Sequence, residues 1–156
     1  AYGDSYIPKG DDYFTEDSVL EDTDFFADVT VLSARLDSDS AHYTLRINSL
    51  VSKTGEESKT NITIESSTPY IMQENREYFI PLRKENGTYS MAFENAPQIE
   101  ISLDGDIVFQ NGWKSLDDDS GILKDSQKSK NDYFYDRMRY SSKNDLQDLL
   151  AKWRTM

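Results

Sequence analysis

The clearest pattern along the chain is an alternation of apolar and polar side chains between residues 25 and 82, which predicts three or four strands. In the first of these, residues 25–36, the apolar positions change face midway: Ala27, Val29 and Val31 come first, then Leu32, Ala34 and Leu36. A two-residue period cannot change face without an extra residue, a bend or burial of both faces. We therefore predict a bulge or a strong bend at this point. The side chains before it (Val29 and Val31) should be buried on one side, and those after it (Leu32 and Ala34) on the other.

Three more strands follow. The second alternates between a polar face and an apolar face, whose members are Tyr43, Leu45, Ile47 and Val51. The third is short and should turn Ile62 and Ile64 inward. The fourth, residues 77–83, is apolar on both faces in its middle and contains Pro81. Because proline has no N–H to donate to a strand ladder, we expect Pro81 at a sheet edge or at a bulge.

Beyond the fourth strand, two dipeptides predict tight hairpins. Asn86-Gly87 lies between two strand-like runs, and Asp104-Gly105 would be the two-residue loop of an added hairpin over residues 98–110.

The last segment has the clearest helical pattern in the chain. Its apolar side chains recur at i, i+3, i+4 and i+7, namely Leu146, Leu149, Leu150 and Trp153. This apolar stripe should pack on the sheet.

These elements divide the chain into three parts: a flexible acidic lead-in (1–18), a β-barrel domain (19–113), and a linker with a C-terminal helical segment that packs on the barrel (114–156). A helical turn is expected at residues 18–24 and a further helix at residues 132–140. The net charge of −12 is uneven, since residues 124–156 hold 8 basic and 5 acidic side chains. We expect this basic tail to dock on the acidic body of its own chain.

The acidic body limits the classes of partner. It repels phosphate backbones, so we expect no nucleic-acid binding, and it disfavours anionic lipid surfaces. No apolar run approaches the ~20 residues of a membrane span. The chain has no Cys, begins at Ala1 without a signal-like segment, and carries an acidic lead-in. From these features we expect a monomeric extracellular or cell-surface protein in a mature form, with a lipid anchor before trimming as one option.

Few side chains have the spacing of a known chemical site. The single histidine, His42, excludes a two-His metal site, and its place on a polar strand face is typical of a surface residue. Aspartates with D-x-D spacing include the pairs at residues 37/39, 104/106 and 117/119. A calcium loop needs a Glu at its twelfth position, but counting from Asp37 gives Asn48 and counting from Asp117 gives Lys128. We therefore predict no metal and no cofactor, and the common nucleotide, zinc-protease and serine-hydrolase motifs are missing.

The order of strand types resembles a known family. The runs that carry the resemblance are Ala-Asp-Val-Thr-Val (27–31), Tyr-Thr-Leu-Arg-Ile (43–47), Asn-Ile-Thr-Ile (61–64) and Glu-Tyr-Phe-Ile-Pro-Leu (77–82). Together they resemble small secreted bacterial OB-fold domains, relatives of the tissue inhibitors of metalloproteinases and of netrin-like modules. The expected fold is accordingly mainly β, a five-stranded OB-like barrel with an extra hairpin and a C-terminal helical segment. A β-sandwich is the alternative, since short strands at regular spacing fit it too.

The chain departs from the family pattern at three points. The segment before Tyr78 lacks the usual glycine, and Ser33 stands where a glycine often permits the first strand to bend. Inhibition of metalloproteinases is not implied, because that activity needs an N-terminal Cys to chelate zinc and this chain has no Cys. The resemblance therefore carries a fold expectation and no activity.

The function that we expect is a non-enzymatic binding module for a protein or glycan partner. OB-type barrels bind across the face of their second and third strands. Here that face consists of His42, Thr44, Arg46, Asn48, Asn61, Thr63 and Glu65. It has no stacking aromatics, which argues against single-stranded nucleic acid. Two alternatives stay open: a hydrolase that uses acidic residues, and a purely structural module of a surface assembly.

Overall fold

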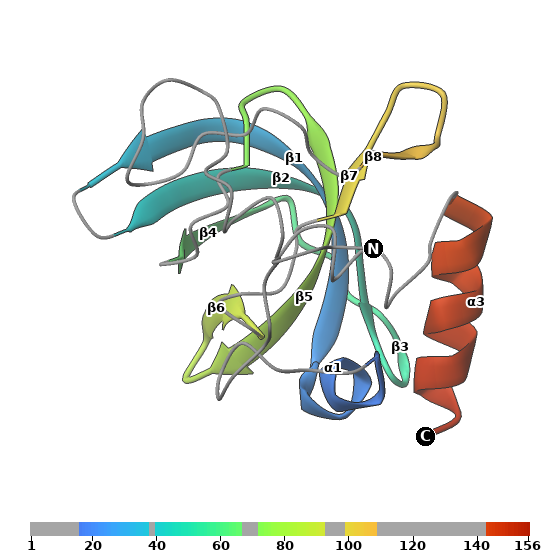
Figure 1. Cartoon of the computed structure of the whole chain (residues 1–156). Helices are drawn as coiled ribbons and strands as arrows, with labels where there is room; N and C mark the ends of the chain where they lie inside the picture. The colour runs from blue at the N-terminus through green and yellow to red at the C-terminus, as the bar shows by residue number, and fades with distance from the viewer. Residues whose placement is uncertain (1–15, 38–39, 67–71, 93–98, 109–142) are drawn as a thin grey trace, which may run out of the picture.

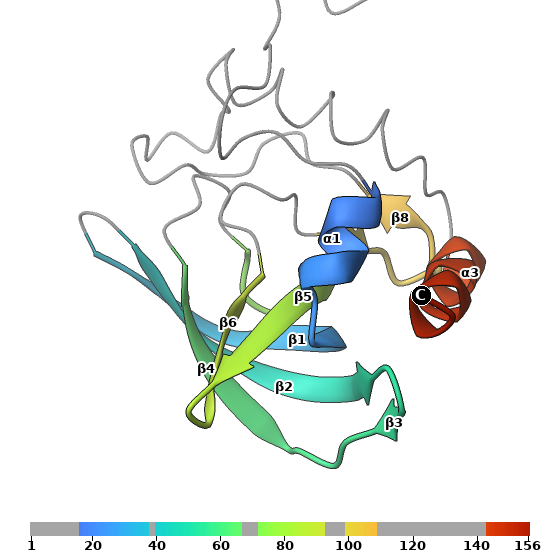
Figure 2. The ribbon, with the colours of Figure 1, turned by 90° about the horizontal axis from the view of Figure 1, so that it is seen from below.

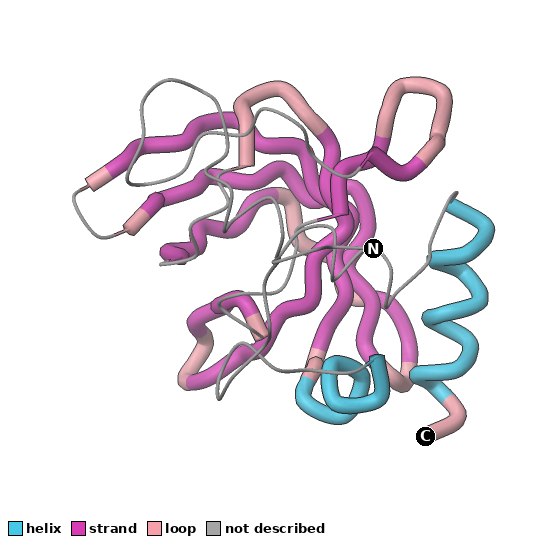
Figure 3. The backbone as a smooth tube through the Cα atoms, viewed as in Figure 1, coloured by secondary structure: helices cyan, strands magenta, loops and turns pink. Residues whose placement is uncertain are grey.

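The computed structural model describes residues 16–37, 40–66, 72–92, 99–108 and 143–156, and their architecture is mainly β, as predicted (Figures 1 and 3). In chain order the elements are α1 (Glu16–Asp22), β1 (Phe25–Leu36), β2 (Ala41–Ser52), β3 (Gly55–Glu56), β4 (Asn61–Ser66), β5 (Glu77–Glu85), β6 (Thr88–Met91), β7 (Ile99–Ile101), β8 (Ile107–Val108) and α3 (Lys143–Arg154). The strands form one antiparallel sheet in the order β3-β2-β1-β5-β7-β8. Off this path, β4 pairs with β2 and β6 pairs with β5.

The predicted closed barrel is not supported, because the described strands form an open sheet. The sheet curls so that β4 and β6 approach each other, yet no hydrogen-bonded ladder joins them (Figure 2). Both are short, with six residues in β4 and four in β6. The observed sheet is therefore nearer to the sandwich alternative than to a five-stranded barrel.

Pro81 lies where the pairing of β5 changes. Residues 77–79 of β5 pair with β7, and residues 82–85 pair with β6. On the other side of the strand, Pro81 pairs with Phe26 of β1. Since proline has no N–H, neither ladder continues through this position. Pro81 is therefore not on an outer edge of the sheet but at an interruption between two ladders.

The predicted irregularity in β1 is present, but it buries different side chains than expected. The pairing with β2 shifts register between Val31 and Ser33, so Leu32 is the extra residue of a bulge. Leu32 is 42% exposed, while Ala34 packs against the same core as Val31. The prediction that Leu32 and Ala34 are buried on the opposite side is therefore wrong. The bulge accommodates one extra residue, Leu32, and the apolar side chains after it point to the same core as those before it.

A second register shift, in β2, was not predicted. Asp28 pairs with Ser49 and Val29 pairs with Ile47, so Asn48 is the extra residue. Beyond it the two faces of β2 are exchanged, and Val51 lies in a different core from Ile47. The predicted apolar face of this strand is thus correct through Ile47 and wrong at Val51.

The sheet separates two apolar cores. The inner core lies within the curl and contains Phe25, Ala27, Val29, Val31, Ala41, Tyr43, Leu45, Leu50, Ile62, Ile64, Met72, Tyr78, Ile80, Leu82, Tyr89 and Met91. The outer core lies between the opposite face and the helices, and contains Val19, Leu20, Phe26, Val51, Phe79, Ile99, Ile101, Leu146, Leu149, Leu150 and Trp153. The inward orientation predicted for Ile62 and Ile64 is confirmed.

Helix α3 packs on the sheet through the predicted stripe, all of which is buried. The Trp153 ring meets the Phe26 ring edge-on, with 4.9 Å between the ring centroids. At the end of the helix, Arg154 donates hydrogen bonds to the carbonyls of Ser52 and Gly55, both at 3.3 Å. The described end of the basic tail is thus docked on its own chain.

Not every predicted segment falls within the described ranges. The helix predicted at residues 132–140 lies outside them, as do most of the lead-in and the linker. The helical turn predicted at 18–24 corresponds to α1, which begins and ends two residues earlier. Within the described ranges, no helix combines the length and the apolar character needed to span a membrane.

The two hairpins differ in how well they were predicted. At the β5–β6 turn, Asn86 (φ 51°) and Gly87 (φ 80°) both have left-handed backbone, as a two-residue turn with a mirror-image twist requires. The β7–β8 hairpin has a longer loop than predicted. Ser102 N donates to Asp106 O at 2.8 Å, and this hydrogen bond closes a loop of three residues, 103–105. Leu103 therefore belongs to the loop and not to the strand, and its side chain is fully exposed.

Candidate functional site

The seven residues of the predicted binding face do lie together on two neighbouring strands. In the β2–β4 ladder, His42 pairs with Glu65, Thr44 pairs with Thr63, and Arg46 pairs with Asn61. Asn48 follows Arg46 along β2, at the bulge. The alternation of β2 and the short period-2 pattern of β4 are sufficient to produce this face.

Two surface hollows divide the predicted face between them. The Arg46 hollow has a volume of about 700 Å³ and is lined by Thr30, Arg46, Asn48, Asn75, Arg76, Glu77, Glu100, Ile101, Ser102 and Leu103. The His42 hollow has a volume of about 720 Å³ and is lined by Ser33, Ala34, Arg35, His42, Tyr43, Thr44, Thr63, Ile64, Glu65, Thr88, Tyr89 and Ser90. Asn61 lines neither of them.

A hydrogen-bonded cluster positions Arg46 in its hollow. Arg46 Nη2 donates to Thr30 Oγ1 at 3.3 Å, and Asn48 Nδ2 donates to the same oxygen at 3.0 Å. Asn48 Nδ2 also donates to Asp28 Oδ1 at 3.2 Å. Arg46 makes no ion pair with any residue in the described part of the chain. Its guanidinium is held in place through one of its five N–H donors, and the others are available.

The opposite wall of the Arg46 hollow contains a buried carboxylate. The Glu100 side chain is only 7% exposed, and Arg76 Nη1 donates to its Oε1 at 3.0 Å. Tyr78 donates its hydroxyl proton to the same oxygen at 3.4 Å. These two donors compensate for the removal of the carboxylate from water. Glu100 therefore fixes the position of Arg76 at the rim of the hollow.

Two buried tyrosines hold the segment that leads into β5. Met72 N donates to the Tyr43 hydroxyl oxygen at 3.0 Å, and Gln73 N donates to that of Tyr78 at 2.9 Å. Burial raises the pKa of Tyr43 to about 12. Burial also raises the pKa of Tyr78 above its usual range, with a smaller contribution in the same direction from the charge of Glu100. Both tyrosines thus stay neutral and shape this side of the site without taking part in proton transfer near neutral pH.

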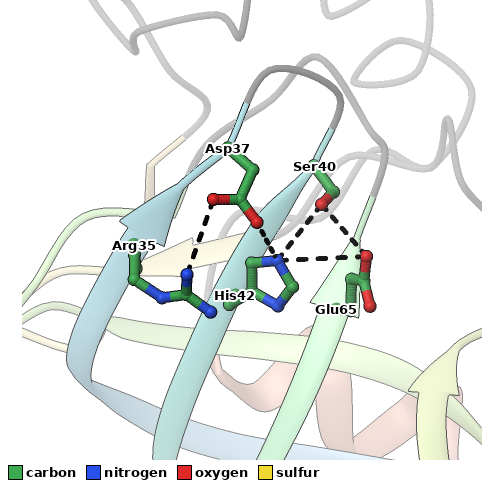
Figure 4. Close-up of polar contacts among 5 residues, drawn as sticks. All are labelled: Arg35, Asp37, Ser40, His42 and Glu65. Atoms are coloured by element: carbon green, nitrogen blue, oxygen red, sulfur yellow. Dashed lines mark hydrogen bonds and ion pairs between the residues drawn. The ribbon is translucent and has the colours of Figure 1, made fainter.

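The single histidine lies in a polar cluster at the other end of β2 (Figure 4). Its Nε2 lies 2.6 Å from Asp37 Oδ2, 3.3 Å from Ser40 Oγ and 4.0 Å from Glu65 Oε1. In a Ser-His-Asp relay, the carboxylate holds Nδ1 and the serine hydroxyl faces Nε2. In this cluster the same nitrogen, Nε2, faces both carboxylates and the serine hydroxyl.

The serine in this cluster is also directed elsewhere. Ser40 donates its hydroxyl proton to Glu65 Oε1 at 3.0 Å. The arrangement therefore ties the end of the β1–β2 pair to β4, and it is not that of an activated nucleophile. Among the described residues, no group of three potential metal ligands was found.

Most residues of the Arg46 hollow were not predicted. The sequence identified Arg46 and Asn48, but not Thr30, Arg76, Glu100 or Ser102. They come from β1, β7, the β7–β8 loop and the segment before β5, and they meet only through long-range pairing. A signal was present for Glu100 alone, as an acid between the two apolar residues Ile99 and Ile101.

The comparisons with known proteins add no identity: no protein-family model matches the chain, and a search of curated proteins found no match.

Proposed function

We propose that this protein is a non-enzymatic binding module for a protein or glycan partner, and that the Arg46 hollow makes the central contact. The observation that carries this proposal is the state of Arg46. Its side chain is exposed, is held by one hydrogen bond to Thr30, and has no ion pair with the described residues. A volume of about 700 Å³ is within the usual range of ligand pockets.

The contacts of the acidic residues favour binding over hydrolysis. A glycosidase needs two carboxyl groups about 5–9 Å apart in one cleft. The hollow has two acids, Glu77 and Glu100, of which only Glu100 is buried. Because Oε1 of Glu100 already accepts from Arg76 and Tyr78, this carboxylate has a structural explanation. The hydrolase alternative therefore has less support.

The alternative of a purely structural module also has less support. Its expected contact was the apolar stripe of the C-terminal helix. That stripe is buried against the sheet of its own chain, so it offers no apolar surface to a neighbour. We keep an extracellular or cell-surface location as part of the proposal, since an acidic, Cys-free chain fits a binding role there.

Affinity capture with matched variants tests the proposal. The purified chain, Arg46→Gln and Arg35→Gln would each be immobilised and exposed to the extracellular and envelope fractions of the source cells. Arg35 is a good control, because it is on β1, its side chain is 70% exposed, and it lies outside the Arg46 hollow. We expect a partner that is retained by the natural chain and by Arg35→Gln, and lost with Arg46→Gln. Equal capture by all three proteins would refute the role of the hollow.

A further inference from the structure

We propose that the Arg46 hollow binds an extended protein segment that presents a carboxylate with an apolar side chain a few residues away. This inference rests on the proposed function, because it names the chemistry that the same site would select. It follows from the donors at one end of the hollow, the exposed Leu103 at the other end, and the charge of the whole chain.

The β2 side of the hollow offers donors to an anion. Arg46 uses one of its five N–H groups on Thr30. Thr30 Oγ1 accepts from both Arg46 and Asn48, which leaves its own hydroxyl proton available for a ligand. A planar guanidinium beside a hydroxyl donor matches the two oxygens of a carboxylate, and such charge-assisted bonds are stronger than neutral ones.

Three acidic residues lie at or near the hollow, namely Asp28 on β1, Glu77 on β5 and, at the opposite end, Glu100 on β7. Asp28 Oδ1 accepts from Asn48 Nδ2, and Glu100 Oε1 accepts from Arg76. Asp28 and Glu77 nevertheless repel an incoming carboxylate, because Asp28 lies two residues from Thr30 on the same face of β1 and Glu77 pairs with Thr30 from β5. Replacing Asp28 with a neutral residue should therefore improve binding of the carboxylate.

The far end of the hollow carries one exposed apolar side chain, that of Leu103. Arg46, Thr30, Glu77 and Ile101 are successive neighbours in one row across β2, β1, β5 and β7. Three strand spacings of about 4.8 Å place the ends of this row roughly 14 Å apart. The fully exposed Leu103 stands beyond Ile101 on the β7–β8 loop. An extended segment of about five residues spans this length, with its first and fifth side chains on one face.

The charge of the chain restricts the ligand further. The net charge of −12 repels polyanions. For a long acidic polymer, this repulsion would cancel the favourable interaction with Arg46. A single carboxylate avoids this cost. No aromatic side chain is among the described residues that line the hollow, so it lacks the stacking platform on which a sugar ring would rest. A protein segment therefore fits better than an acidic glycan.

Titration of the isotope-labelled full chain, followed by NMR, tests this inference. The main probe is an acetylated pentapeptide amide with Glu first, Leu fifth and small neutral residues between. Its counterpart has Gln in place of Glu, and glucuronic acid is the sugar probe. We expect the Glu peptide to shift the amide signals of Thr30, Arg46 and Ser102 in a saturable way. The Gln peptide should bind at least about tenfold more weakly, as expected for loss of a charge-assisted hydrogen bond.

Matched variants locate the contact. Arg46→Gln should reduce the affinity for the Glu peptide about tenfold and Leu103→Ser severalfold, while Asp28→Asn should increase it. Arg35→Gln should leave it unchanged. Equal binding of the Glu and Gln peptides, or no shift with either, would overturn the inference. If glucuronic acid alone shifts these signals, the peptide inference fails and the proposed binding function stands. If capture of a partner is also insensitive to Arg46, both fail.

Discussion

Replacing Trp153 with alanine is the most direct test of how the C-terminal helix is held. The Trp153 side chain is completely buried, and its ring packs edge-on against Phe26, which in turn stacks on Phe79 at 5.1 Å. Removing a buried Trp side chain typically costs about 3–5 kcal/mol in unfolding free energy. The indole Nε1 has no hydrogen-bond partner in the described part of the structure. Removing this buried, unpartnered group is favourable and offsets part of the loss in unfolding free energy. We therefore expect a net loss of about 3 kcal/mol.

The measurement is a thermal unfolding curve followed by circular dichroism, with near-ultraviolet ellipticity as a second probe. For a chain of this size, 1 kcal/mol lowers Tm by about 2–4 °C, so Trp153→Ala should lower it by about 6–12 °C. Gln147→Ala is the matched control, since Gln147 is exposed on the same helix and should leave Tm almost unchanged. Trp153→Phe keeps an aromatic ring and removes the unpartnered N–H, so it should cost less than Trp153→Ala. An unchanged Tm for Trp153→Ala would refute the packing described for α3.

Two further predictions concern the inner core and the turns. Burial raises the pKa of Tyr43 to about 12, above the value near 10 expected in the unfolded chain, so the unfolded state loses this proton first. Stability should therefore fall as pH rises from ~10 to ~12, and urea midpoints measured across this range should show the fall. Tyr43→Phe should make the decline shallower. An equally steep decline in that variant would contradict the assignment of the pKa shift to Tyr43. Gly87 has a φ of +80° and Gly55 is in open space without positive φ, so Gly87→Ala should cost about 1 kcal/mol and Gly55→Ala close to nothing. Equal urea midpoints for these two variants would contradict the turn geometry.

The features that sequence predicted well depend on local pattern. The helical stripe ending at Trp153 and the turn at Asn86-Gly87 are each determined by a few neighbouring residues. The alternation around Ile62 and Ile64 is equally local, and its burial was confirmed. In each of these cases the period or the turn chemistry determines which side chains face the core, whatever the rest of the chain does.

The errors come from positions where pairing between strands decides the outcome. Asn48 is an extra residue only relative to the strand opposite, so nothing in its own neighbourhood identifies it as a bulge. The irregularity at Leu32 was predicted from the change of face, but the side chains that it buries depend on the pairing with β2. Openness of the sheet depends on whether β4 and β6 form a ladder, which strand periodicity does not report. The Arg46 hollow is a similar case: Thr30, Arg46 and Glu77 meet through two ladders that join residues 16 to 47 positions apart.

The central position of β1 has a consequence for how the protein opens. Over its first six residues β1 is hydrogen-bonded to β2 on one side and to β5 on the other. Its consecutive residues Phe25 and Phe26 enter the inner and the outer core respectively. Successive amides of β1 point alternately to β2 and to β5, so release of all of them to solvent requires both neighbouring strands to separate, which disrupts both cores at once. The backbone amides of this strand should therefore exchange with deuterium only through global unfolding, and the two cores should behave as one cooperative unit.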